Sequence, residues 1–174
     1  MVRAKTEKSA TCCAVAVMAV LFALDVDPGN GGVYEGCPWW HCLTWMWLHG
    51  NWVHVLLNAW ALIQIVFGWE VRWRSIAEAV GVAMVWSWLC REGVTVCGGE
   101  GEVIVGMSGV IYALAGVEAL RQGSWNERGY MMMMWLASIA VTAAVGWIVG
   151  RMAWEAHLEC YCLGVAMAFL HYRY

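Results

Sequence analysis

The sequence contains few charged residues and only two prolines. Of its 174 residues, 13% are Asp, Glu, Lys or Arg, whereas 62% are apolar. Soluble domains are typically about half apolar and about one quarter charged, so this composition indicates a membrane protein. The net charge of −3 is scattered, and no basic stripe alternates with aromatic residues. Nucleic acid is therefore not an expected partner.

The cysteines and histidines lack the spacing of a metal site. The chain has eight cysteines, but none of them forms a CxxC pair. The residues of a type that binds zinc are Cys37, His41, Cys42, His49 and His54. Their spacing matches no zinc pattern, so we expect neither a metal nor another cofactor. The sequence leaves open whether Cys37 and Cys42 form a disulfide.

The apolar residues form six long blocks, which predict membrane-spanning helices. The blocks are residues 10–24, 52–71, 76–90, 108–121, 130–149 and 153–169. Because a spanning helix needs roughly 20 apolar residues, the length of the chain fits about six spans with short loops. We therefore predict an all-α membrane protein with one domain, residues 1–174, in which the fourth helix is short.

The segment 25–44, after the first apolar block, predicts a loop that lies in the membrane interface. It contains both prolines and several glycines, which interrupt helices. It also contains Tyr34, Trp39 and Trp40, and such aromatic side chains favour the interface. The cationic residues before block 10–24 also suit a signal peptide. We expect the first helix to be retained, because the later spans need an anchor of its orientation.

The distribution of basic residues predicts that both termini face the cytoplasm. In that orientation the inner ends of the blocks carry Arg3, Lys5, Lys8, Arg72, Arg74, Arg121, Arg128 and Arg173. The outer ends carry only Arg91 and Arg151. This excess of positive charge inside agrees with the rule for membrane proteins. The loop 25–44 and the glycine-rich segment 93–106 then face the exterior.

Polar residues within the predicted spans mark a candidate site. Such residues are costly inside a membrane and tend to be functional. Four of them fall toward the outer ends of their spans, namely His54, Asn58, Ser108 and His157. Because these residues would lie at a similar depth, we expect their side chains to meet.

Ser108 and His157 have the chemistry of a nucleophile and its base. Ser108 lies between Gly106 and Gly109 at the start of a predicted helix. Glycines let a substrate approach the backbone, and a helix N-terminus supplies free N–H groups for an oxyanion. A histidine activates a serine hydroxyl by accepting its proton. Taken alone, Ser108 is equally suited to cap the helix, and His157 to anchor a helix at the interface.

His54 and Asn58 are candidates for stabilising an oxyanion. They are four residues apart, so they lie on one face of the second predicted helix. From that face both side chains could donate hydrogen bonds to a developing negative charge, which is a large contribution in acyl transfer. The alternative is a structural hydrogen bond between helices. His49 precedes the same helix and could brace the site or the loop.

Three motifs make the sequence resemble the rhomboid family of intramembrane serine proteases, in its minimal six-helix bacterial form. Residues 54–58, HVLLN, are similar to the HxxxN motif of the family. Residues 106–114, GMSGVIYAL, are similar to its GxSGxxY segment. Ala156-His157 together with Gly164 is similar to its AHxxGxxxG segment. The resemblance extends over residues 40–169.

The resemblance implies a serine endopeptidase with a Ser108–His157 dyad. It implies an oxyanion site formed by the Ser108 backbone N–H, His54 and Asn58. It also implies that the ring of Tyr112 packs against the His157 ring and orients it. The reaction would be peptide hydrolysis through an acyl-enzyme, in a cavity that water reaches from the exterior.

The resemblance also implies how a substrate reaches the site. Leu57 and Trp147 would occupy a lateral gate between the second and fifth spans. The substrate would be the transmembrane or juxtamembrane segment of another membrane protein, cut where its helix unwinds. The expected location is a bacterial inner membrane, with both termini cytoplasmic.

Three residues depart from the family pattern. His41 stands where the first loop of the family has Arg, so we expect the loop to be anchored differently. Cys160 replaces a glycine at a place where small residues let helices approach closely, which puts the distance between Ser108 and His157 in question. Glu155 replaces a small residue near His157.

Two other functions are compatible with a chain that crosses the membrane several times. A non-catalytic rhomboid-like protein binds membrane clients and directs their folding or degradation, but such proteins usually lack the catalytic Ser or His. A transporter or channel would show inverted repeats and broken helices in both halves, and the sequence shows neither. The favoured hypothesis is an active protease.

Overall fold

The computed structural model describes residues 3–69, 71–95, 102–121, 124–149 and 153–171. Its long helices are α1 (Arg3–Ala23), α3 (Trp52–Gly68), α4 (Trp73–Arg91), α5 (Ser108–Ala119), α6 (Trp125–Val149) and α7 (Trp154–His171). Short helical turns lie at η1 (Pro28–Asn30), α2 (His41–Thr44) and η2 (Trp45–Trp47). The prediction of an all-helical protein is confirmed for the described ranges, which contain a single isolated β-bridge and no strand.

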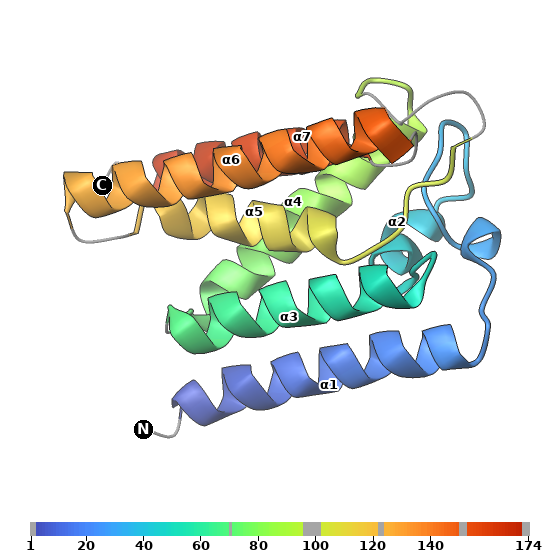
Figure 1. Ribbon diagram of the computed structural model, residues 1–174, viewed down its shortest axis with the longest axis horizontal. Coiled ribbons are helices and arrows are strands. Elements are labelled where there is room, and N and C mark those ends of the chain that lie inside the picture. The colour runs from blue at the N-terminus through green and yellow to red at the C-terminus, as the bar shows by residue number, and fades with distance from the viewer. Residues whose placement is uncertain (1–2, 70, 96–101, 122–123, 150–152, 172–174) are drawn as a thin grey trace.

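The six long helices form a bundle in which successive helices alternate in direction (Figure 1). The starts of α3, α5 and α7 therefore lie at one end of the bundle. The start of α1 and the end of α7 lie at the other end. This arrangement brings His54, Ser108 and His157 to the same end, because each lies at the start of its helix.

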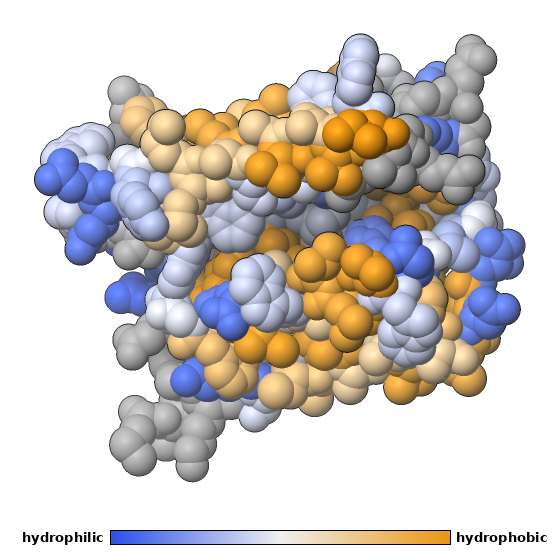
Figure 2. Space-filling view, in the orientation of Figure 1, coloured by the Kyte–Doolittle hydropathy of each residue, from blue (hydrophilic) through white to orange (hydrophobic). Residues whose placement is uncertain are grey.

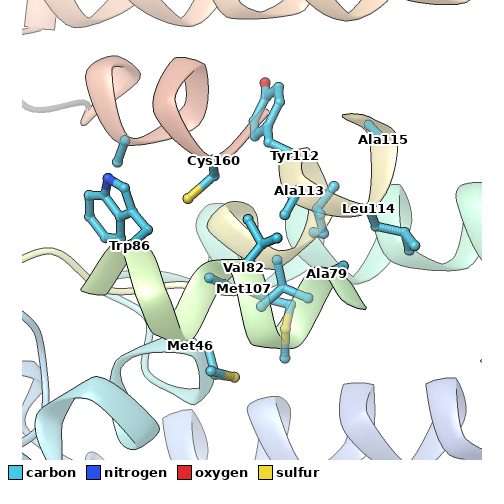
Figure 3. Close-up of a cluster of buried hydrophobic side chains, with 14 of the residues drawn as sticks. Met46, Ala79, Val82, Trp86, Met107, Tyr112, Ala113, Leu114, Ala115 and Cys160 are labelled. Atoms are coloured by element: carbon cyan, nitrogen blue, oxygen red, sulfur yellow. The ribbon is translucent and has the colours of Figure 1, made fainter. Parts of the chain in front are cut away.

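Helix α5 is the centre of the bundle, and every residue after Ser108 in this helix is buried. It packs most extensively against α7 and next against α4. Figure 3 shows this core, which includes Tyr112 and Ala113 of α5, Trp86 of α4 and Cys160 of α7. With 12 residues, α5 is about 18 Å long, which is less than the roughly 30 Å hydrocarbon core of a bilayer.

Glycine makes the close contact between α5 and α7 possible. A Cβ atom on Gly164 of α7 would lie 2.2 Å from the carbonyl oxygen of Ala113. A Cβ on Gly116 of α5 would lie 2.4 Å from the carbonyl oxygen of Tyr161. Since no side chain fits at either position, the two backbones touch directly, as small residues allow in membrane bundles.

The outer surface of the bundle is strongly apolar. Large apolar side chains are exposed on the long helices other than α5, for example Val20, Trp60, Val85, Met133 and Leu170. Figure 2 shows broad apolar bands along the bundle, with hydrophilic residues concentrated toward its two ends. Soluble monomers rarely expose apolar patches of this extent, so the surface suits contact with lipid.

Individual helices differ in how well they suit a membrane span. Among the described helices, only the part of α6 from Trp125 to Val145 is long and apolar enough to cross a bilayer alone. The bent pair His41–Trp47 and Trp52–Gly68 counts as a second span if it is taken as one. Helix α5 is short, and α4 and α7 carry charged residues, which lowers their mean hydropathy. Six spans therefore remain a prediction.

The observed helices extend beyond some of the apolar blocks. Helix α1 begins at Arg3, whereas the first block begins near residue 10, and α6 begins at Trp125 and not near residue 130. The additional turns contain polar residues such as Asn126 and Glu127. Hydropathy marks only the apolar middle of a helix, so it misses polar turns at the ends.

The first loop is tied to the segment that leads into α5. Val33 and Ile104 exchange two backbone hydrogen bonds, each 2.9 Å long. His41 Nδ1 donates to the carbonyl of Gly32 at 2.5 Å, so this histidine anchors the loop through its ring. Arg91 at the end of α4 donates through Nε to a carbonyl of the loop at 2.8 Å. The bridge between Val33 and Ile104 holds the segment before Ser108 against the first loop. The bonds of His41 and Arg91 hold the loop itself in place.

We predict that Gly164→Ala will destabilise the bundle by about 1–3 kcal/mol, because its methyl group must push the backbones of α5 and α7 apart. Thermal unfolding in detergent, followed by circular dichroism, measures the effect. Gly81→Ala is the matched control, since a Cβ at Gly81 of α4 meets nothing within 4 Å. That variant should be as stable as the wild type or more so, because alanine favours helices. Equal stability of both variants would contradict the prediction.

Candidate active site

The side chains of Ser108 and His157 meet where α5 and α7 begin. Ser108 is the first residue of α5, and His157 lies in the first turn of α7. The distance from Ser108 Oγ to His157 Nε2 is 3.0 Å, so the hydroxyl can donate to the ring nitrogen. His157 is buried, with 8% of its surface exposed, while Ser108 is partly exposed. The pair therefore has the geometry of a serine and its base.

Tyr112 lies against the ring of His157. Its ring stacks on the imidazole with centroids 4.5 Å apart and an angle of 22° between the planes. Tyr112 is one turn after Ser108 on α5, so the serine and the stacking ring come from the same helix. The tyrosine hydroxyl is 2.8 Å from Ser138 Oγ on α6. This contact and the stacking together fix the position of the tyrosine ring beside the imidazole.

Gly106 brings the backbone before Ser108 close to two polar side chains of α3. Its φ of +118° lies in the region that favours glycine, and its N–H donates to the carbonyl of Trp45 at 2.9 Å. A Cβ at this position would lie 2.6 Å from His54 Nε2 and 3.1 Å from Asn58 Nδ2. Both side chains thus face the entry to α5, where the N–H of Ser108 has no acceptor within its helix.

The side chain of Asn58 is hydrogen-bonded to His49, which precedes α3. Asn58 Nδ2 donates to His49 Nε2 at 2.9 Å, and His49 Nδ1 lies 3.3 Å from the carbonyl oxygen of Trp47. Burial, reinforced by the adjacent His54, lowers the pKa of His49 to about 4. The ring is therefore neutral at pH 7, with its proton on Nδ1, and its Nε2 accepts from Asn58. His49 thus connects Asn58 to the turn before α3, and its bracing role stays a prediction.

Two residues of α6 that the sequence analysis missed also reach the site. Ser138 contacts the hydroxyl of Tyr112, and Thr142 Oγ1 lies 3.4 Å from His157 Nδ1. The sequence contains a signal for them, because they are hydroxyl residues four apart in a strongly apolar helix. That spacing places both on one face.

The residues that depart from the family pattern are accommodated without separating Ser108 from His157. Cys160 is fully buried, and its Sγ lies 3.4 Å from where a Cβ of Gly109 would be. The thiol therefore packs against α5 at an ordinary van der Waals distance. Glu155 is partly exposed, and in the part of the chain that the structure describes the imidazole nitrogens contact Thr142 and Ser108 and not this carboxylate.

The loop cysteines do not form a bridge with each other. Cys37 and Cys42 are both buried free thiols, and burial raises the pKa of the Cys42 thiol. Cys90, at the end of α4, is disulfide-bonded. Within the described ranges, no group of three or more His, Cys, Asp or Glu side chains is arranged to hold a metal ion.

The two residues expected to form a lateral gate, Leu57 and Trp147, both have exposed side chains. Leu57 on α3 is 56% exposed, and Trp147 near the end of α6 is 92% exposed. Helix α3 packs mainly against α1, whereas α6 packs against α7 and α5. The space-filling view shows a recess between the surfaces of α3 and α6 (Figure 2). The gate formed by Leu57 and Trp147 stays a prediction.

Comparison with known protein families matches residues 36–174 to the Rhomboid domain. The chain belongs to the rhomboid family. This confirms the resemblance drawn from the three motifs, and it makes the chain a member of a family of integral membrane proteins that are typically intramembrane serine proteases. No match was found among curated proteins.

We predict that Gly106→Ala will lower kcat/KM for peptide hydrolysis at least about tenfold, because the new methyl group displaces His54 and strains the backbone. Steady-state cleavage of a transmembrane substrate measures the effect. Gly36→Ala is the matched control, since Gly36 also has a positive φ of 76° but has nothing within 4 Å of its Cβ position. If both variants lose activity equally, backbone strain alone explains the loss and the contact with His54 does not matter.

Proposed function

We propose that this rhomboid-family chain is an intramembrane serine endopeptidase with Ser108 as nucleophile and His157 as base. The observation that carries the proposal is the 3.0 Å contact between Ser108 Oγ and His157 Nε2. A serine is a poor nucleophile without such a partner, and a buried histidine within hydrogen-bond reach supplies it. The two residues come from separate helices, so their contact requires the folded bundle.

The proposed reaction proceeds through an acyl-enzyme. His157 Nε2 takes the hydroxyl proton while Ser108 Oγ attacks the scissile carbonyl carbon. The carbonyl oxygen becomes an oxyanion, which the Ser108 N–H, His54 and Asn58 stabilise with hydrogen bonds. The imidazolium gives its proton to the leaving amine as the peptide bond breaks. A water molecule, activated by the same imidazole, then hydrolyses the ester and regenerates Ser108.

The proposed membrane arrangement has six spans with both termini in the cytoplasm. The alternating directions of the long helices and their apolar outer surface support it. The disulfide bond of Cys90 lies at the same end of the bundle as Ser108, and disulfides persist in oxidising compartments outside the cytosol. The site then opens toward the exterior, and the proposed location is the bacterial inner membrane.

The proposed substrates are transmembrane or juxtamembrane segments of other membrane proteins. They would enter between α3 and α6, past Leu57 and Trp147. Because α5 is short, Ser108 lies below the outer end of the bundle. A substrate helix must unwind there to present a carbonyl group, since a helical carbonyl is already hydrogen-bonded.

The alternative is a non-catalytic family member that binds membrane clients. The contact between Ser108 and His157 favours the protease, because a binding protein does not need a base beside a serine hydroxyl. The two functions differ in whether Ser108 is chemically reactive.

We predict that a fluorophosphonate probe will label the wild-type protein in detergent, and that Ser108→Ala will abolish the labelling. The probe reacts only with an activated serine, so it tests the nucleophile without a known substrate. Ser124→Ala is the control, because Ser124 is exposed and bonds to Glu127 away from the site, so this variant should retain labelling. A folded wild-type protein that shows no Ser108-dependent labelling would favour the binding function.

We also predict that Asn58→Ala will lower kcat about 10²–10³-fold with a smaller change in KM, because an oxyanion donor acts in the transition state. Steady-state kinetics with a cleaved transmembrane segment separates the two constants. A change confined to KM would mean that Asn58 binds substrate and does not stabilise the oxyanion.

A further inference from the structure

Helix α6 presents two hydroxyl side chains to the residues around Ser108. Ser138 and Thr142 are four residues apart, so they lie on one face of the helix. Both are partly buried, whereas the neighbouring Leu136, Ala137, Ala140 and Val141 are exposed. The hydroxyl face therefore points into the bundle, and the apolar face points outward.

The hydrogen bonds of Thr142 determine which part it plays toward His157. Thr142 Oγ1 donates its hydrogen to the carbonyl of Ile139 at 2.8 Å. A hydroxyl has one hydrogen and two lone pairs, so the same oxygen can only accept from His157 Nδ1, which lies 3.4 Å away. A hydrogen bond between Thr142 Oγ1 and His157 Nδ1 therefore forms only when His157 carries its proton on Nδ1.

This requirement matters because a neutral imidazole has two tautomers. With the proton on Nδ1, the Nε2 lone pair faces Ser108 Oγ at 3.0 Å and can accept the serine proton. With the proton on Nε2, that nitrogen would be a donor and could not act as a base. We propose that Thr142 is a positioning residue that holds His157 in the Nδ1–H tautomer and fixes the direction of its ring. This inference rests on the proposed function of the dyad.

The separation of 3.4 Å is long for an N–H···O hydrogen bond, which is consistent with a resting site. Such contacts are often long before substrate binds, and they shorten as charge develops. When His157 takes the serine proton, the Nδ1–H becomes part of a cation and bonds more strongly to its acceptor. Thr142 would therefore act mainly in the transition state, which predicts an effect on kcat.

Ser138 supports the same imidazole by a second route. It holds the hydroxyl of Tyr112 at 2.8 Å, and the Tyr112 ring stacks on His157. The stacking restricts the tilt of the imidazole but does not select its tautomer. Thr142 also hydrogen-bonds to the side chain of Tyr112. Of the two hydroxyl residues, Thr142 is the one that contacts a ring nitrogen of His157, so it is the one that can select the protonation site.

The test compares Thr142→Val with Thr142→Ser in detergent-solubilised full-length protein. Valine keeps the shape of threonine without the hydroxyl, so we expect kcat to fall about 5- to 50-fold with KM changed less than about twofold. Serine keeps the hydroxyl and should restore most of kcat. Thr11→Val is the matched control, because Thr11 Oγ1 donates to the Glu7 carbonyl within α1 just as Thr142 does within α6.

Three results would overturn the inference. The first is a Thr142→Val enzyme with wild-type kcat, and the second is a loss that appears only in KM. The third is a ¹⁵N spectrum of wild-type protein labelled at histidine that places the neutral proton of His157 on Nε2, a measurement that needs no variant to fold. If the wild type itself lacks Ser108-dependent activity, the proposed function fails. If the wild type is active and Thr142→Val has the same kcat, only the role of Thr142 is overturned.

Discussion

The direct backbone contact between α5 and α7 is the constraint on which the rest of the structure depends. Ser108 and His157 lie on different helices, so their 3.0 Å contact is set by how closely these helices approach. Gly116 and Gly164 have no Cβ, and this absence lets each lie against a carbonyl of the opposite helix. Membrane helices gain little from hydrophobic association, so such van der Waals contact is what holds them together. The buried Cys160 packs against Gly109 of α5 without separating Ser108 from His157.

A second constraint fixes the backbone in front of Ser108. The bridge between Val33 and Ile104 and the bond from Gly106 N–H to the Trp45 carbonyl hold this segment against the first loop. Since Gly106 lies against His54 and Asn58, the same contacts set the distance from the helix N-terminus to the polar face of α3. The first loop thus contributes to the candidate site through backbone contacts.

Residues that follow a local pattern could be predicted from the sequence, whereas contacts between distant segments could not. The four-residue spacing of His54 and Asn58 and the glycines around Ser108 are local, and they were sufficient to indicate the family. The bond from Arg91 to the first loop joins residues 54 apart, and no periodicity reveals it. Thr142 was missed for a related reason, because one hydroxyl in an apolar helix usually bonds to its own backbone. Only the fold shows that its free lone pair points at His157.

Helix α6 carries residues of the proposed gate and residues that contact Tyr112 and His157. The gate requires the helix to move, whereas the contacts require it to stay in place. Trp147 belongs to the proposed gate for substrate, whereas Ser138 contacts Tyr112 and Thr142 contacts His157. Because these residues lie on one continuous helix, a displacement that widens the recess also moves the two hydroxyl groups. Light packing of α6 against its neighbours makes such a displacement inexpensive. Hydrogen bonds to Tyr112 and His157 are directional, so they are lost over a shorter distance than apolar contacts. The proposed mechanism therefore requires α6 to lie where Thr142 contacts His157, as in the structure, when His157 acts as the base. Substrate entry and proton transfer would then be successive steps.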